Sequence, residues 1–360
     1  MGVLGSRGSV EGHSSRRAAE RVFRGLGASF AVLLIALMLV FVPVESAQAA
    51  AITVDTTADE LNADGDCALR EAIQAANTDT AVDSCAAGSG VDMIVVPAGT
   101  YTLGIGGNLE DANATGDLDI TASLTINGAG SASTVVDGAD LDRVLHVVGG
   151  TVAISGVTIQ NGTSSIPGGA CPPGSGGGIR NSGTLSLANV TVTDNLGQGC
   201  GGGGINNTVG AILTIDDSIV SDNWTNACCG DGGGGILNEG TLIMNRSTVK
   251  DNLVAGQSGD GGGIHNRGVA TLTNLTVSGN ESACLGGGIM NGRGGGIATV
   301  TNLTITNNTV RCSLAGGGIF NHGPGSATVK NTIVANNPTG GNCAGTMTSR
   351  GGNLDSANTC

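Results

Sequence analysis

Residues 176–195 read Gly176-Gly-Gly-Ile-Arg-Asn-Ser-Gly-Thr-Leu-Ser-Leu-Ala-Asn-Val-Thr-Val-Thr-Asp-Asn195. The landmarks of this stretch return along the chain and indicate its architecture. Gly-Gly-Gly-Ile recurs in steps of 26, 31, 28, 25 and 30 residues, with isoleucines at Ile179, Ile205, Ile236, Ile264, Ile289 and Ile319. An asparagine stands two residues after each isoleucine, at Asn181, Asn207, Asn238, Asn266, Asn291 and Asn321. A second pattern, Val or Ile, then two residues, then Asn, ends at Asn195, Asn223, Asn252, Asn280, Asn308 and Asn337. Six units that hold three landmarks in one order indicate a repeat architecture.

Between the landmarks, apolar residues alternate with polar ones, as in Thr184-Leu185-Ser186-Leu187 and Val190-Thr191-Val192-Thr193. This period of two predicts about three short strands in each unit, separated by Gly, Asn or Asp turns. No segment after residue 80 has a helical period, so the strands of one unit must pair with the equivalent strands of the next. We therefore predict an all-β fold over residues 91–345, a single-stranded right-handed parallel β-helix of the pectate-lyase-like kind.

The repeated glycines and asparagines have structural roles in such a solenoid. Glycine reaches positive φ at little cost and allows one turn to lie close to the next. Asparagines at one register of successive coils can bond to one another along the axis. We expect the asparagines two residues after each isoleucine to form such a ladder rather than to bind a ligand.

Composition supports this fold and argues against several functions. The chain has 65 glycines and only 7 prolines, which excludes a collagen-like sequence, and aromatic residues make up 2%. Its formal net charge is −14, and an acidic surface repels phosphate backbones, so we expect no nucleic-acid partner. We expect no cofactor.

Residues 1–49 have the pattern of an export signal. Five arginines precede an apolar run at 31–42, and Ala47-Gln48-Ala49 fits a cleavage site. An uncleaved anchor is the alternative interpretation. No second apolar run approaches membrane-spanning length, so we expect no transmembrane segment in the mature chain and a secreted or cell-surface location.

All ten cysteines follow the predicted cleavage site, and an even count in an exported chain points to disulfides. No pair has Cys-x-x-Cys spacing, so we expect no metal site. Six cysteines lie five to eight residues before a repeat isoleucine, where stacked loops come within disulfide reach. We predict a disulfide bond between Cys284 and Cys312. We also predict that Cys171, Cys200, Cys228 and Cys229 form disulfides with one another, in a pairing that the sequence leaves open. The remaining cysteines that we expect in structural disulfides are Cys67, Cys85, Cys343 and Cys360.

Residues 67–77 form the clear amphipathic helix of the mature chain, with Leu69, Ala72, Ile73 and Ala76 on one face. Asp64 or Asp66 is the expected cap of its first turn. The helix precedes the first strands, so we expect it to cover the first coil of the solenoid. Cys67 and Cys85 flank the helix and are expected to join.

The sequence around this helix resembles a known family. Asn62-Ala-Asp-Gly-Asp-Cys-Ala-Leu-Arg-Glu-Ala72 is similar to the CSLREA motif of bacterial secreted proteins, with Ala68 in the place of serine. The Gly-Gly-Gly-Ile and Val-x-x-Asn units resemble the repeats of polymorphic outer-membrane proteins. The segment 331–360 resembles the start of a choice-of-anchor Q domain. These resemblances imply a surface-displayed β-helix with no established catalysis. Proteins of this kind are often tethered by C-terminal sorting signals, and an association with the outer membrane is one location that the resemblance allows.

The resemblance predicts three regions after the signal at 1–49. They are a CSLREA-like cap at 50–90, the β-helix at 91–345 and the choice-of-anchor Q-like region from 331. Domains of the last kind normally continue beyond the position of Cys360. A fragment, a truncated gene product and a form secreted without a tether remain open.

A polysaccharide lyase or hydrolase is the alternative function, because many right-handed β-helices are such enzymes. Glycoside hydrolysis needs two carboxylates at a defined separation. Asp216-Asp217 is the adjacent Asp pair of the repeats, and we expect it in a solvated turn. Arg246 and Lys250 are expected on a different face of the coil, and His265 and His322 lie in contexts unlike those of such enzymes.

The function that we predict is an exported scaffold for adhesion or extracellular binding, not an enzyme, with an unknown extracellular protein or glycan as partner. Trp224, in Asp222-Asn-Trp-Thr-Asn226, is expected in an exposed turn and is the residue that we select as a possible ligand contact. Weak Ca²⁺ binding by the acidic surface remains open, although Asn62-Ala-Asp-Gly-Asp66 departs from an EF-hand loop.

Overall fold

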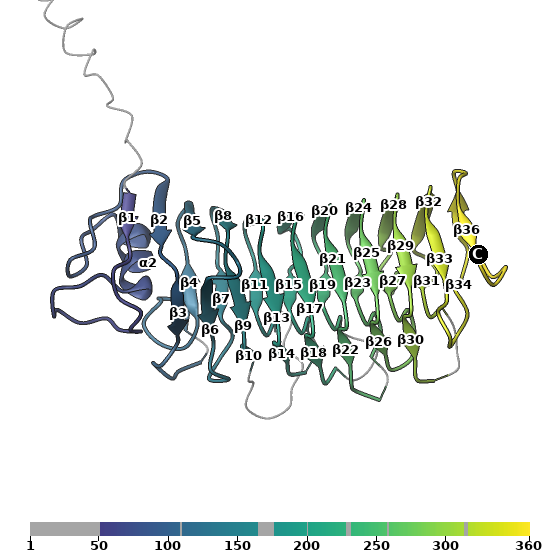
Figure 1. Ribbon diagram of the computed structural model, residues 1–360, viewed down its shortest axis with the longest axis horizontal. Coiled ribbons are helices and arrows are strands. Elements are labelled where there is room, and N and C mark those ends of the chain that lie inside the picture. Colours follow the sequence, from purple (N-terminus) through teal and green to yellow (C-terminus); the bar gives the residue numbers. More distant parts are fainter. Residues whose placement is uncertain are drawn as a thin grey trace, which may run out of the picture. The chain divides into compact units, whose positions relative to one another are not determined.

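The computed structural model describes residues 51–108, 110–164, 176–199, 201–227, 232–257, 259–312 and 316–360. The chain divides into units 1–47 and 48–360, and every described residue belongs to the second. This unit is a parallel β-helix of about eight turns in which equivalent strands of successive turns pair (Figure 1).

Four sheets run along the solenoid in the described part of the chain, and each is a stack of equivalent strands. Sheet 1 comprises β1 (Ala51–Thr53), β2 (Asp92–Val96), β5 (Leu124–Gly128), β8 (Thr151–Ser155), β12 (Thr184–Ala188), β16 (Ile212–Asp216), β20 (Thr241–Asn245), β24 (Val269–Thr273), β28 (Ile297–Thr301), β32 (Ser326–Lys330) and β35 (Thr348–Ser349). Sheet 2 comprises β3 (Gly99–Thr102), β6 (Thr134–Asp137), β9 (Thr158–Gln160), β13 (Thr191–Thr193), β17 (Ile219–Ser221), β21 (Thr248–Lys250), β25 (Thr276–Ser278), β29 (Thr304–Thr306), β33 (Ile333–Ala335) and β36 (Leu354–Asp355).

Sheet 3 includes the six strands that begin at the repeat isoleucines. It comprises β4 (Leu118–Ile120), β7 (Leu145–Val147), β11 (Ile179–Asn181), β15 (Ile205–Asn207), β19 (Ile236–Asn238), β23 (Ile264–Asn266), β27 (Ile289–Asn291), β31 (Ile319–Asn321) and β34 (Cys343–Ala344). Sheet 4 comprises the two-residue strands β10 (Thr163–Ser164), β14 (Leu196–Gly197), β18 (Trp224–Thr225), β22 (Leu253–Val254), β26 (Glu281–Ser282) and β30 (Thr309–Val310). This fourth strand, which six successive coils of the described chain contain, was not expected from the sequence, because two residues show no alternation.

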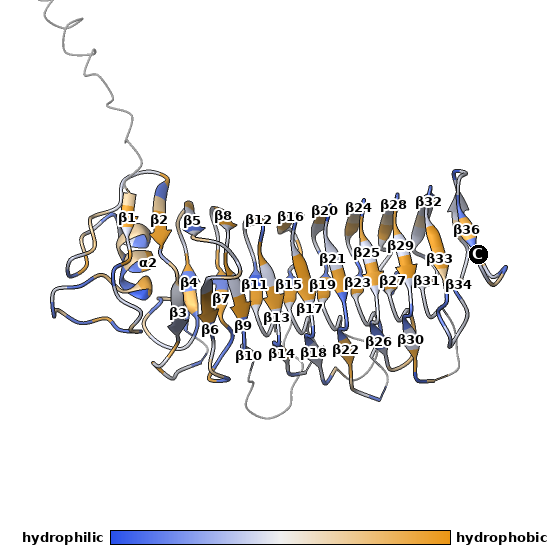
Figure 2. Ribbon diagram, viewed as in Figure 1, coloured by the Kyte–Doolittle hydropathy of each residue, from blue (hydrophilic) through white to orange (hydrophobic). Residues whose placement is uncertain are grey.

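The core runs along the axis of the solenoid. Figure 2 shows the hydrophobic residues concentrated in the stacked strands. Ile205, Ile236 and Ile264 are fully buried and lie in register on successive strands of sheet 3. Sheet 1 contributes alternate residues, such as Leu213 and Leu242, to the same core. The period of two in the sequence therefore separates core from surface in these strands.

The glycines before each isoleucine allow neighbouring coils to approach closely. A Cβ atom built on Gly204 would lie 2.8 Å from the carbonyl oxygen of Gly235 and 2.9 Å from Cγ of Asn223. Gly204 does not have positive φ, so close approach rather than backbone conformation excludes larger residues there.

The helix α2 (Leu69–Thr78) lies at the N-terminal end of the stack and packs against β2 and β4 (Figure 1). The expected aspartate cap was wrong, because the residue at the N-cap is Ala68. Glu71, in the first turn, bonds back to this residue: its Oε2 accepts the backbone N–H of Ala68 at 3.0 Å. Among the described residues, no helix has the length and hydropathy needed to span a bilayer.

Candidate functional site

The outward-facing residues of β4, β7 and β11 bring ionisable groups into one column. Asp119, His146 and Arg180 occupy equivalent positions of the three strands, one coil apart. Their neighbours in each strand point inward, as Leu118 does, so this column lies on the outer side of sheet 3. Asp119 and His146 are nevertheless buried, and the segment that precedes β4 contributes contacts to both.

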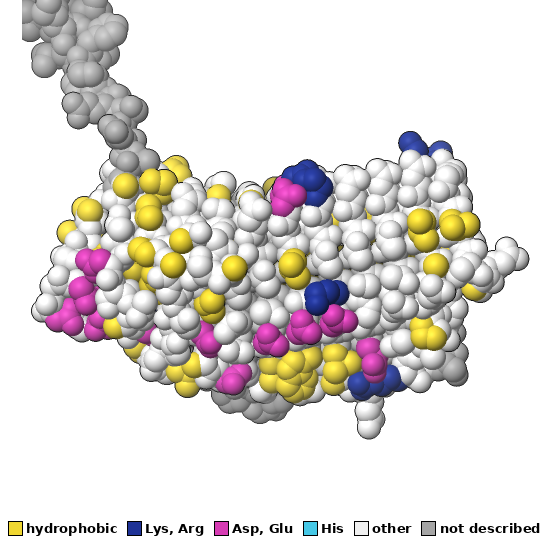
Figure 3. All heavy atoms as spheres, viewed as in Figure 1, with side chains coloured by type: hydrophobic (Ala, Val, Ile, Leu, Met, Phe, Trp, Pro, Cys, Tyr) yellow, Lys and Arg dark blue, Asp and Glu magenta, His cyan; other side chains and the backbone are white. Residues whose placement is uncertain are grey.

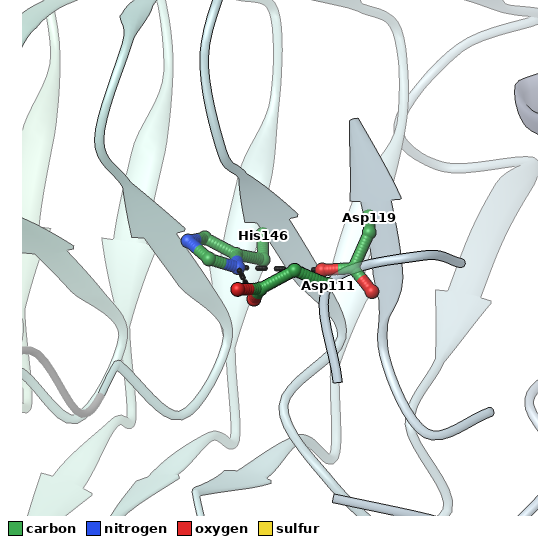
Figure 4. Close-up of side chains that lie close together, drawn as sticks. All are labelled: Asp111, Asp119 and His146. Carbon is green, nitrogen blue, oxygen red and sulfur yellow. Dashed lines mark ion pairs between the residues drawn. The ribbon is translucent and has the colours of Figure 1, made fainter. Parts of the chain in front are cut away.

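Two carboxylates converge on one nitrogen of His146 (Figure 4). Its Nδ1 lies 3.2 Å from Oδ1 of Asp111 and 3.3 Å from Oδ1 of Asp119. The His146 side chain is 4% exposed and that of Asp119 is fully buried, whereas the side chain of Asp111 is 65% exposed. The three ligand atoms all lie within 4.8 Å of one another. Because the Asp111 side chain is largely exposed, the site is open to solvent on that side.

Asn113 holds the Asp119 carboxylate in place. Its backbone N–H donates to Oδ2 of Asp119 at 3.1 Å, and its side-chain Oδ1 accepts the backbone N–H of Asp119 at 3.3 Å. The Asn113 amide also donates to the backbone oxygen of Arg70 in α2 at 2.9 Å. Oδ1 of Asp119 therefore faces His146 while Oδ2 is already bonded.

Arg70 fastens the N-terminal cap to the same segment. The guanidinium is fully buried, pairs with Asp59 at 2.6 Å and donates to the backbone oxygens of Gly116 and Asp117 at 2.8 and 3.1 Å. The arginine of the CSLREA-like motif thus joins α2 to the chain that enters β4. A buried arginine needs such partners, because an unpaired charge in the interior is costly.

Further charges lie beside this site. Burial and the neighbouring charge of Asp117 raise the pKa of Asp142 to about 6. Burial also raises the pKa of Asp119. Arg143 loses hydration on burial, but its pKa is raised because the charge and hydrogen bond of Asp117 outweigh that loss. The pKa of Arg180 is lowered by burial and by the charge of Arg143.

This group of side chains was not predicted from the sequence. Asp111, Asp119 and His146 come from three separate segments, and the regular Gly-Gly-Gly-Ile unit begins only after them. Aligning Leu118-Asp119-Ile120 with Leu145-His146-Val147 would have placed the aspartate and the histidine at one register. That signal was present but weak, because the glycine landmark is missing from both strands.

Trp224 is exposed, but it begins the strand β18 rather than lying in a turn as expected. Its side chain is 38% exposed and lies in register between Leu196 and Leu253 of the adjacent coils. Three exposed aspartates precede these residues by two positions, at Asp194, Asp222 and Asp251. We call these six residues the Trp224 strip. Figure 3 shows hydrophobic side chains gathered over β18 and β22, beside a row of acidic side chains.

The asparagines of sheet 3 bond to one another along the axis. Five side-chain contacts of 2.7 to 2.8 Å connect Nδ2 of each asparagine to Oδ1 of the next, from Asn181 through Asn207, Asn238, Asn266 and Asn291 to Asn321. A second ladder runs through the asparagines of the Val-x-x-Asn pattern, Asn195, Asn223, Asn252, Asn280, Asn308 and Asn337. The members of both ladders are almost fully buried, so they satisfy one another's polar groups inside the solenoid.

Three disulfides are present in the described residues: Cys67–Cys85, Cys284–Cys312 and Cys343–Cys360. They indicate an oxidising, extracytoplasmic environment. The expected cluster of Cys171, Cys200, Cys228 and Cys229 lies outside the described residues.

Of this pair, the expected turn holds only Asp217: Asp216 is the last residue of β16, and Asp217 follows it before β17. Both side chains are partly exposed. The prediction that Arg246 lies on a different face was wrong. Its guanidinium donates to both carboxylate oxygens of Asp217 at 2.8 Å and lies 3.2 Å from Asp216, because the equivalent turn of the next coil stacks on this one. The hydrogen bond from Arg246 lowers the pKa of Asp217.

Another acidic group lies in the cap. Carboxylate oxygens of Glu60, Asp64 and Asp66 come within 4.8 Å of one another in the segment that departs from an EF-hand. Asn62 already donates to Glu60 at 2.7 Å and to Asp64 at 3.2 Å. These hydrogen bonds account for Glu60 and Asp64, whereas Oδ1 of Asp66 is buried without a hydrogen-bond partner among the described residues.

No protein-family model matches the sequence, and no curated protein matches it. Among solved structures, one similar chain is the catalytic domain of a GH87 alpha-1,3-glucanase variant in complex with nigerose. The match has a TM-score of 0.24 and 15% identity, and it covers 72% of this chain and 64% of that one. A likeness at this level carries no argument about activity.

Proposed function

We propose that the chain is an exported, non-catalytic β-helix scaffold that binds an extracellular glycan through the Trp224 strip. The oxidising environment indicated by the disulfides and the signal-like residues 1–49 support export. The resemblance to CSLREA-type secreted proteins supports display outside the cell.

The Trp224 strip is the observation that carries the proposal. Trp224 is 38% exposed and has a leucine on either side in register, which gives a narrow apolar face. Sugar rings present apolar faces that pack on aromatic side chains, and their hydroxyl groups donate to carboxylates. Asp194, Asp222 and Asp251 supply such acceptors at the turn before each strand.

The solenoid makes this surface rigid and periodic. Asn195, Asn223 and Asn252 are buried directly beside the exposed aspartates and bond to one another across the coils. Parallel strands repeat at about 4.8 Å, so the acceptors form a row at that spacing. A periodic row favours a polymer over a compact ligand.

Charge selects among polymers. The chain carries a net charge of −14, and the row of aspartates adds local negative potential. Polyuronates would be repelled, whereas a neutral glycan would not. We therefore propose a neutral glycan as the ligand, and a protein partner is the other outcome that the test could give.

The test uses the single tryptophan of the chain as its reporter. We expect neutral polysaccharides such as glucans, galactans and mannans to be retained or to shift Trp224 fluorescence, with binding lost in Trp224→Ala. Ile333→Ala is the matched control, because Ile333 is 43% exposed on sheet 2. Equal binding by both variants, or binding of polyuronates alone, would contradict the proposal.

The enzyme alternative is tested with the same polymers and with uronic-acid polymers. Reducing ends or unsaturated products would be measured for the native chain and for Asp217→Asn. Turnover that is lost in this variant would overturn the non-catalytic proposal. We expect no release above background with either protein.

A further inference from the structure

We propose that Oδ1 of Asp111, Oδ1 of Asp119 and Nδ1 of His146 bind one divalent transition-metal cation of the zinc type. The proposal does not depend on the glycan-binding function. It rests on the separation of the three atoms, on buried polar atoms that lack partners, and on the chemistry of the donor set.

The distances fit a metal polyhedron. Zinc lies about 2.0–2.1 Å from nitrogen and carboxylate ligands, so two ligands at tetrahedral positions are roughly 3.3 Å apart. Nδ1 of His146 lies 3.2 Å from Oδ1 of Asp111 and 3.3 Å from Oδ1 of Asp119. Oδ1 of Asp111 and Oδ1 of Asp119 lie within 4.8 Å of each other, so a cation held by all three atoms would need these two oxygens to approach by at most about 1.5 Å.

Buried atoms at the centre of the group lack hydrogen-bond partners. Among the residues that the structure describes, both ring nitrogens of His146 and Oδ1 of Asp119 have none. The His146 side chain is 4% exposed and that of Asp119 is fully buried, so water does not satisfy them freely. Buried polar groups without partners are costly, and a bound cation would supply the missing interaction.

An ion pair explains the arrangement less well. A protonated His146 carries one Nδ1 proton, whereas two carboxylate oxygens approach this nitrogen at nearly equal distances. Neither contact has hydrogen-bond geometry. A metal ion accepts the lone pair of the neutral ring and both carboxylates at once.

The donor set selects the class of metal. One imidazole with carboxylates suits zinc and its first-row neighbours, whereas Ca²⁺ and Mg²⁺ prefer sites made of oxygen alone. The exposed side of Asp111 leaves room for a water molecule as fourth ligand.

The surroundings already orient the ligands. Asn113 donates its backbone N–H to Oδ2 of Asp119 and leaves Oδ1 for the cation. Such outer contacts fix the ligands of metal sites. Because Asp111 lies before β4 and His146 lies on β7, the cation would fasten the segment 110–117 to sheet 3.

The test is a zinc titration of the full chain after treatment with a chelator. A chromophoric competitor and elemental analysis would measure affinity and stoichiometry in the native chain and in Asp111→Asn, Asp119→Asn and His146→Gln. We expect one zinc per chain and an affinity at least about 100-fold lower in each variant. His322→Gln is the control for histidine loss, and Asp64→Asn tests the acidic group of the cap; both should bind as the native chain does.

X-ray absorption of the zinc complex should show one imidazole and oxygen ligands at about 2.0–2.1 Å. Unchanged binding in Asp111→Asn and His146→Gln, or loss only in Asp64→Asn, would overturn the site. Absence of stoichiometric binding would leave an ion pair only and would also overturn it. Asp111→Asn keeps the test decisive if the buried variants fail to fold, because the Asp111 side chain is 65% exposed.

Discussion

Replacing Asn238 by alanine tests whether the asparagine ladder stabilises the solenoid. Asn238 donates Nδ2 to Oδ1 of Asn266 and accepts from Nδ2 of Asn207, both at 2.7 Å. Its amide also donates to the backbone oxygens of Gly240 and Val269 at 3.2 Å. The alanine variant removes all four contacts from a fully buried position.

Each hydrogen bond contributes about 1 kcal/mol net, and a buried partner left unsatisfied costs about 1–3 kcal/mol. Asn207 retains a bond to the backbone oxygen of Thr241 at 3.1 Å, which limits the damage on that side. We therefore expect Asn238→Ala to lower the free energy of unfolding by about 3 kcal/mol. With a urea dependence of about 1–3 kcal/mol per molar, the midpoint should fall by at least about 1 M.

Urea unfolding followed by the fluorescence of Trp224, on the neighbouring coil, measures this change. Asn245→Ala is the matched control, because Asn245 ends the same coil's strand β20 but faces outward and is only partly buried. We expect the control to change stability by less than about 0.5 kcal/mol. Equal losses in the two variants would refute the structural role of the ladder.

Three further predictions concern the disulfide, the repeat glycines and pH. Replacing Cys284 and Cys312 by serine opens a link between residues 28 apart and should cost roughly 3 kcal/mol in urea unfolding; unchanged stability would contradict this. Gly235→Ala puts a Cβ atom 2.7 Å from the carbonyl oxygen of Gly263 and should lower the free energy of unfolding by about 1–3 kcal/mol. Gly104→Ala is the control, because nothing in the described chain lies within 4 Å of the added Cβ atom, and it should cost much less. Similar losses of stability in the two variants would show that close approach does not explain the repeat glycines. Burial lowers the pKa of His265 to about 4 from its ordinary 6.5, so the unfolded chain takes up a proton at a higher pH than the folded chain does. The free energy of unfolding should therefore be highest above pH 6.5 and should fall by roughly 3 kcal/mol as the pH falls to about 4. Urea unfolding of the native chain and of His265→Gln between about pH 4 and 7 should show a stability difference that changes with pH in this direction. Parallel curves of stability against pH for the two proteins would contradict the prediction.

The regular repeat region could be predicted from the sequence because the Gly-Gly-Gly-Ile and Val-x-x-Asn patterns recur in each of its six units. Ile179 and Asn181 each mark one register, and the strands of sheets 1, 2 and 3 follow from the alternation between landmarks. Parallel pairing then places equivalent residues one coil apart without further information. The Cys284–Cys312 bond follows from the same register.

The Asp111, Asp119 and His146 group could not be read in this way. Its segments precede the regular units, so no landmark aligned them. The contact between Arg246 and Asp217 was missed for a different reason. Both residues have positive φ at equivalent turns, and the side-chain direction there depends on backbone conformation rather than on period.

If the Trp224 strip binds a neutral glycan, as we propose, the bound polymer should cover this strip on the native chain. Hydrogen–deuterium exchange of the native chain, with and without the neutral polysaccharide that it retains best, measures this protection. Protection should appear in peptides that cover residues 194–198, 222–226 and 251–255, and it should be absent in Trp224→Ala. Protection confined to other surfaces, such as residues 110–119 and 143–147, would contradict the proposal.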